Sequence, residues 1–144
     1  MKYRLSILLS CLGLALVIAA PARAQMPGTT IRANIPFDFI VRGKTLPAGS
    51  YQLSRITDSP EGLEIYSRAN HQEVMFETDA VERRTPDRGE LMFHRYGNTY
   101  FLYEIWTPGE SIGRELPASR AERRIEREAA STNTKPEMVA LALE

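Results

Sequence analysis

The two histidines are the first residues to test for chemistry, because imidazole serves both as a metal ligand and as a general base. His71 stands in a predicted turn and His94 in a predicted strand with the sequence MFHRY. Neither has a second ligand at zinc-site spacing. The single cysteine, Cys11, lies in an N-terminal apolar run. We therefore expect no metal and no cofactor, and we interpret His94 as a partly buried, hydrogen-bonded residue of a strand.

Carboxylates are the next candidates, since two acids on facing strands can act as the acid and base of a glycosidase. Glu104 is the most interesting of them, because alternation in TYFLYEIW places it on an apolar face with Tyr100 and Trp106. If that face is buried, Glu104 needs a partner such as Arg95 or Arg114, and a structural ion pair is favoured over a catalytic acid. The acids on predicted strands are Asp38, Glu64, Glu77 and Glu104.

Nucleophilic catalysis would require a serine held against a base. No serine of this sequence has the glycine-flanked surroundings of a nucleophile elbow, and Ser119 fits the role of a helix cap. The sequence thus names no catalytic residue and favours a non-enzymatic protein, with a small hydrolase as an alternative. A second alternative is a glycan- or lipid-binding face formed by the aromatic residues Tyr96, Tyr100, Tyr103 and Trp106.

The N-terminal residues have the pattern of an export signal. Lys2 and Arg4 precede an apolar run, Leu5 to Ala20, and the following PARA ends in the small-x-small pattern that signal peptidase cuts. The run is short for the roughly 20 residues of a membrane-spanning helix. We predict a signal peptide over residues 1–24, cleavage after Ala24, no transmembrane segment thereafter, and a periplasmic or secreted protein.

Charge and cysteine content limit what residues 25–144 can do. The chain carries 18 basic and 18 acidic side chains, and the signal peptide removes three bases and no acid, so the mature chain is net acidic. That balance gives no overall attraction to nucleic acid. The mature chain has no cysteine, which excludes disulfide exchange and thiolate nucleophiles. Its length suits one domain that buries a core unaided.

Alternating apolar residues in the mature chain predict β-strands. The clearest alternation runs from Ile31 to Val41, with Pro36 on its polar side, which indicates an edge strand or a bulge. Turn residues such as Gly43-Lys44 and Pro47-Ala48-Gly49 recur at short intervals. Six or seven short strands and one late helix predict a mainly β fold, a small antiparallel β-sandwich or partly open barrel, over residues 25–130.

A hairpin and a helix are predicted in the second half. Gly97-Asn98 joins Leu91–Tyr96 to Thr99–Trp106, with glycine where a type II′ turn requires it. Because TYFLYEIW is apolar on both faces, its strand should be central and covered. Ser119 and Glu122 have capping-box spacing and predict a surface helix over residues 119–130.

The last residues, 131–144, are predicted to form a polar linker followed by a short apolar run. The run extends from Met138 to Leu143 and is either a final strand or a flexible tail.

Three segments in order, IPFDFIVRGKTLPAGSY, FHRYGNTYFLYEIW and GRELPASRAERRIERE, resemble a group of small exported bacterial proteins of unknown function. The likeness covers most of the mature chain. It implies export and a shared β-rich fold, and since the group has no assigned activity it transfers no catalytic or binding residue. Within the first segment, only Asp38 lacks an evident folding role.

The sequence as a whole favours an exported, non-enzymatic β-domain with a structural or protein-interaction role in the cell envelope. Its partner is expected to be an envelope protein or a glycan. A protein would be met through an exposed sheet edge, such as the strand predicted over Ile31 to Val41. A glycan would require an aromatic-lined hollow around Tyr100 and Trp106.

Overall fold

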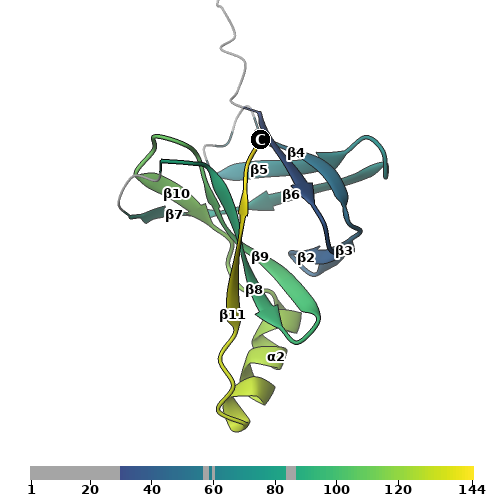
Figure 1. Ribbon diagram of the computed structural model, residues 1–144, viewed down its shortest axis with the longest axis vertical. Coiled ribbons are helices and arrows are strands. Elements are labelled where there is room, and N and C mark those ends of the chain that lie inside the picture. Colours follow the sequence, from purple (N-terminus) through teal and green to yellow (C-terminus); the bar gives the residue numbers. More distant parts are fainter. Residues whose placement is uncertain (1–29, 57–58, 60, 84–86) are drawn as a thin grey trace, which may run out of the picture.

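A computed structural model describes residues 30–56, 59, 61–83 and 87–144. The predicted signal peptide, its cleavage site and Cys11 lie outside these residues. These residues form two β-sheets and one helix, and Figure 1 shows the helix at the opposite end of the molecule from the C-terminus. The predicted mainly β fold with a helix near the C-terminus is confirmed, and the two sheets do not close into a barrel. No helix in the described part of the chain is long and apolar enough to cross a membrane.

The first sheet contains four antiparallel strands in the order β1-β4-β5-β6. Their bounds are β1 Ile31–Ile35, β4 Gly49–Arg55, β5 Gly62–Ser67 and β6 Gln72–Glu77. Side chains alternate between a buried and a more exposed face, as expected for a sheet with one covered side. The buried apolar residues of this sheet are Ala33, Ile35, Tyr51, Leu53, Leu63, Ile65 and Phe76.

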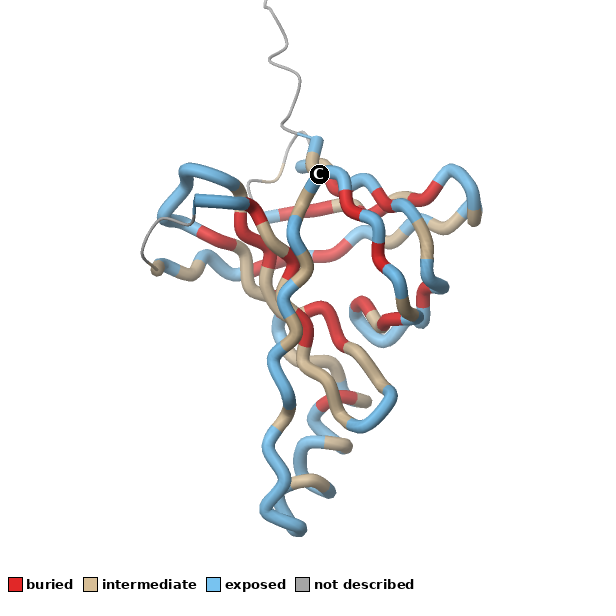
Figure 2. The backbone as a smooth tube through the Cα atoms, viewed as in Figure 1, coloured by how far each residue is buried: buried red, intermediate tan, exposed pale blue. Residues whose placement is uncertain are grey.

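The second sheet has seven strands, of which five form the order β11-β8-β9-β10-β7. A short hairpin, β2-β3, joins it because β2 pairs in parallel with β9. Figure 2 shows the buried residues concentrated in the strands of the two sheets, with the helix largely exposed. The bounds are β2 Phe39–Val41, β3 Lys44–Leu46, β7 Asp79–Glu82, β8 Glu90–Tyr96, β9 Thr99–Trp106, β10 Ile112–Glu115 and β11 Glu137–Ala142.

The strand predicted over Ile31 to Val41 is two strands that belong to different sheets. β1 ends at Ile35, and the chain crosses to β2 through Pro36, which lacks a backbone N–H and cannot continue a ladder. Asp38, in the crossing, accepts a hydrogen bond from the backbone N–H of Ala48 at 2.9 Å. Splits of this kind raise the number of strands in the described residues to eleven, above the six or seven predicted.

Asp38 and Tyr51 together fix the turn that leads into β4. While Asp38 binds the Ala48 amide, the Tyr51 hydroxyl donates to the Pro47 carbonyl at 2.6 Å. The Tyr51 ring also packs edge-on against Phe39, with ring centroids 5.1 Å apart. Asp38 therefore has a structural role in tying the crossing between the sheets to this turn.

β9 is the central strand of the second sheet and is buried on both faces, as predicted. A register shift interrupts its pairing with β8, so that Met92 faces Glu104 and Phe93 faces Leu102. Tyr103 is left over between these pairs as a β-bulge, which shifts the alternation of side chains. Tyr100 and Trp106 consequently lie on opposite faces of β9, and the single aromatic face predicted from strict alternation is wrong.

Trp106 is buried on the outer face of the second sheet. Its indole is 1% exposed and lies under the backbone of Gly113, where an added Cβ would sit 2.7 Å from three ring atoms. The Arg83 guanidinium lies 3.9 Å from the ring centroid, a cation–π contact. The indole Nε1 donates to the Glu104 carboxylate at 2.7 Å. Glu104 thus has Trp106 as its partner in place of the predicted arginine.

The helix and the final strand follow the sequence closely. Helix α2 spans Arg120–Ser131 with Ser119 as its N-cap, and its half-buried stripe is Ala121, Ile125 and Ala129. The C-terminal run forms β11, which pairs antiparallel with β8. The run that was predicted as either a strand or a tail is therefore an integral strand of the second sheet.

Replacing Gly113 by alanine should destabilise the fold by about 1–3 kcal/mol, because the new methyl group overlaps the fully buried Trp106 ring. Urea unfolding followed by tryptophan fluorescence measures this loss. Ser111→Ala, an exposed change two residues earlier, is the control and should leave the free energy of unfolding almost unchanged. Equal stabilities of the two variants would contradict the close packing described.

Candidate functional site

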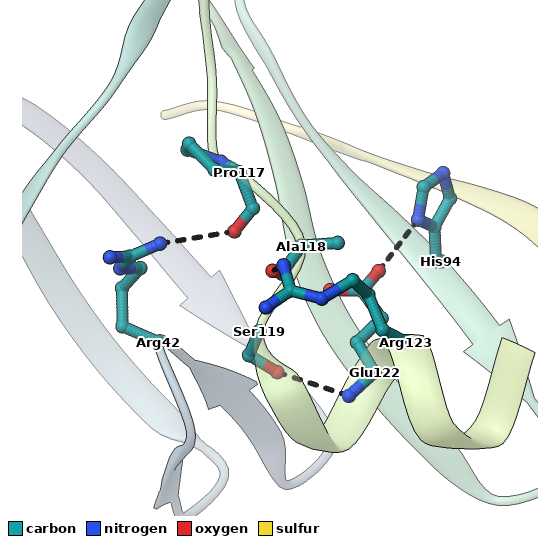
Figure 3. A network of polar contacts seen from close by, with 7 residues as sticks. All are labelled: Arg42, His94, Pro117, Ala118, Ser119, Glu122 and Arg123. Carbon is teal, nitrogen blue, oxygen red and sulfur yellow. Dashed lines mark hydrogen bonds and ion pairs between the residues drawn. The ribbon is translucent and has the colours of Figure 1, made fainter.

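His94 and Glu122 form the most buried pair of potentially catalytic side chains in the described structure. His94 projects from β8, and its Nδ1 lies 2.8 Å from Glu122 Oε1 on the first turn of α2. The two side chains are only 18% and 8% exposed. Figure 3 shows the pair bridging the strand and the helix. His94 is thus the partly buried, hydrogen-bonded residue that the sequence predicted.

The N-terminus of α2 differs from the predicted capping box in one respect. Ser119 Oγ accepts the Glu122 backbone N–H at 3.1 Å, as a cap should. The Glu122 carboxylate, however, turns to His94 and does not return to the Ser119 amide. Glu122, which was expected to complete the capping box, therefore joins the helix to the sheet through His94.

The segment before the helix is held from the opposite side by the β2-β3 hairpin. Arg42, in the turn of that hairpin, donates to the Pro117 carbonyl at 3.2 Å (Figure 3). Arg123 donates to the Ala118 carbonyl. Leu116, 3% exposed, anchors the same segment in the core. These contacts fix the direction in which the chain enters α2.

Tyr103, the bulge residue of β9, lies against this pair. Its ring stacks on the His94 imidazole with centroids 3.9 Å apart. Burial raises the pKa of the Tyr103 hydroxyl, and the negative charges of Glu115, Glu104 and Glu122 raise it further. Glu104 and Glu115 also face each other across β9 and β10. The site is therefore an acidic cluster that surrounds one protonated tyrosine and one histidine.

This cluster has the residue types of an active site, but its side chains line none of the four hollows identified in the described part of the chain. A hollow of about 580 Å³ lies beside α2 and is lined by residues such as Arg95, Tyr96, Ile125 and Lys135, with none of the cluster. Glu104 is occupied by the Trp106 indole, and Glu122 by His94. Among the residues that the structure describes, no group of three or more His, Cys, Asp or Glu side chains is arranged to hold a metal ion.

The other residues singled out from the sequence lie apart from this cluster. His71 is exposed in a turn with a positive φ of 50°. Glu64 and Glu77 lie on β5 and β6 of the first sheet. Ser59 accepts the Gly62 amide at 3.0 Å, and Ser67 is buried in β5. The structure therefore does not bring these side chains together into a catalytic arrangement.

Sheet edges form the second class of candidate surface. β1 and β6 end the first sheet, while β11 and β7 end the five-strand order of the second. The edge at β1, which the sequence suggested as a docking site, meets the C-terminus, since the Glu144 amide donates to the Arg32 carbonyl at 3.1 Å. The edge at β11 was not anticipated, because the final run was not firmly predicted to be a strand.

Comparison with known proteins gives no further guide: no family model, curated protein or solved structure matches this chain. The resemblance to small exported bacterial proteins remains an expectation from the sequence.

Glu122→Ala should lower the free energy of unfolding by about 2 kcal/mol, because it leaves the buried His94 without its hydrogen-bonding partner. Glu126→Ala, at an exposed position on the same helix, is the matched control and should have little effect. Urea unfolding of both variants measures the difference. A loss as large in the control as in Glu122→Ala would show that the His94 contact does not hold the helix.

Stability should fall at alkaline pH. Burial raises the pKa of Tyr51, Tyr96 and Tyr103 above the ordinary value of 10.0, so the folded chain keeps these protons when the unfolded chain loses them. The contribution is complete below pH 10.0 and is lost as pH rises through the raised values. Urea unfolding on both sides of that pH measures the fall, and Tyr103→Phe should reduce it. An unchanged fall in Tyr103→Phe would contradict this assignment.

Proposed function

We propose that this chain is an exported, non-catalytic β-domain that binds another polypeptide in the cell envelope by adding a strand at the edge of β11. The export pattern of residues 1–24 supports the location. The observation that carries the binding role is the edge of β11, a strand that is uncharged from Met138 to Ala142 and that, in the described residues, pairs with another strand only on its β8 side. Strand addition at such an edge is an established mode of peptide recognition.

The direction of the β11 backbone groups follows from two hydrogen bonds near its end. The Leu143 amide donates to Gly89, which precedes β8, whereas the Glu144 amide donates to Arg32 of β1 on the other side. Backbone groups of alternate residues in a strand point to opposite sides. Val139 and Leu141 therefore point toward β8. Met138, Ala140 and Ala142 point toward the free edge.

The side chains of β11 leave this edge unprotected. From Met138 to Leu143 the sequence MVALAL carries no charge and no proline. Met138 is 47% exposed, and Ala140 and Ala142 are exposed and small. Proteins normally protect edge strands with charges, prolines or bulges, and an edge without them pairs readily with another chain.

The edge formed by β6 and β7 is protected in comparison. Its exposed acids repel many partners, and Lys44 Nζ binds the outward carbonyl of Glu73 at 3.1 Å. The contrast between the two edges favours β11 as the functional one. The exposed acids of the β6 and β7 edge are Glu73, Glu77, Asp79 and Glu82.

A non-catalytic role is supported by the use of the polar groups. Glu104, Glu122 and Asp38 each accept a hydrogen bond or bind a partner within the fold, and His94 and Glu122 line none of the four hollows identified among the described residues. A catalytic pair would need to converge on a space that admits a substrate.

The test is site-specific photocrosslinking in intact cells. A benzophenone amino acid replaces Met138 on β11 or, as the matched control, Met75, which is 61% exposed on β6. We expect a discrete polypeptide adduct from the Met138 position only, on a chain whose N-terminus shows removal of residues 1–24. No adduct from Met138, or equal adducts from both positions, would contradict the proposed binding edge.

A further inference from the structure

We infer that the polypeptide that pairs with β11 is a second copy of this chain, aligned antiparallel about a twofold axis at Ala140. The inference rests on the proposed function, since it uses the same edge. In the proposed dimer, β11 of the second copy pairs with β11 of the first and continues its second sheet. A twofold contact of this kind is closed, because each copy uses the same strand.

The outward backbone groups match in this register. Ala140 faces Ala140 of the second copy, and Met138 faces Ala142, so the N–H and C=O groups of all outward residues meet partners. In an antiparallel pair such facing residues exchange both of their backbone hydrogen bonds. The unpaired groups on one copy are therefore satisfied by the same groups on the other.

The side chains also match in this register. Val139 faces Leu141, and both are half-buried against the core side of the sheet, so two apolar side chains meet across the contact. On the other face, the exposed Met138 lies beside the small Ala142. Glu137 faces Leu143, which keeps like charges from standing opposite one another. Facing apolar pairs stabilise a sheet, whereas facing like charges destabilise it.

The acidic edge of the molecule does not suit a second copy. Pairing β6 with β6 would bring Glu73 and Glu77 of both copies together, and pairing β7 with β7 would do the same for Asp79 and Glu82. The mature chain is also net acidic, which adds a general repulsion between copies. Self-association is thus directed to β11, which carries no charge from Met138 to Ala142 and whose single acid, Glu137, binds Arg95.

β1 approaches β11 on the side away from β8, through the hydrogen bond that the Glu144 amide donates to the Arg32 carbonyl. This bond lies beyond the end of β11, which finishes at Ala142. In the described part of the chain, no strand pairs with β11 on the side away from β8. The proposed contact therefore uses the outward groups from Met138 to Ala142, on the part of β11 that precedes the bond to Arg32.

The inference is tested by sedimentation equilibrium of the processed chain over a wide concentration range. We expect a monomer–dimer equilibrium whose dissociation constant rises at least about tenfold in Ala140→Lys, because two lysines then face each other at the axis. Ala80→Lys, at an exposed position on β7, adds the same charge and should leave the equilibrium unchanged. Ala140→Pro removes only an outward N–H and should also weaken the dimer.

The outcomes distinguish a failure of pairing with a second copy from a failure of the proposed binding edge. A chain that stays monomeric at every concentration, or equal effects of Ala140→Lys and Ala80→Lys, overturns pairing with a second copy. If that monomeric chain still gives an adduct from Met138 with a different polypeptide, the proposed function stands and only the choice of partner fails. A Met138 adduct of twice the chain mass, together with the expected dimer, supports both. Urea unfolding of each variant confirms that a monomeric variant is folded.

Discussion

The fold depends on one constraint, which is that β9 must be buried on both faces. One face of β9 closes the space between the two sheets with Leu102 and Ile105, while the other carries Phe101 and Trp106, both about 1% exposed. A strand apolar on both sides cannot end a sheet or face water. Gly113 admits the Trp106 ring, and helix α2 lies against the sheet on the same strand pair, joined through His94.

This constraint also accounts for the buried polar groups. The buried Trp106 indole N–H requires a hydrogen-bond acceptor, and the Glu104 carboxylate provides it. Helix α2 is attached to the outer face of the sheet through the contact between Glu122 and His94. Glu104, Glu122 and His94 have the residue types of an active site, but here they hold Trp106 and helix α2 against the outer face of the second sheet. The second sheet ends at β11 on the side of β8, and we assign binding to that edge.

Sequence patterns predicted the elements well and their arrangement less well. Alternation placed Ile35 and Phe39 on a buried side correctly, but it could not reveal the change of sheet at Pro36, because both sheets face the same core. The bulge at Tyr103 was hidden because TYFLYEIW is apolar at nearly every position, so an extra residue leaves no mark on the pattern. The spacing of Ser119 and Glu122 predicted the helix start, whereas the bond to His94 joins residues 28 positions apart.

Residue-resolved hydrogen exchange on the processed chain tests the central claim most directly. If β11 pairs with β8 on one side and with a second copy on the other, the Val139 and Leu141 amides exchange slowly at all concentrations. The Met138, Ala140 and Ala142 amides then exchange fast in dilute solution and become protected as concentration rises. Fast exchange of these outward amides at every concentration would contradict the pairing of β11 with another copy.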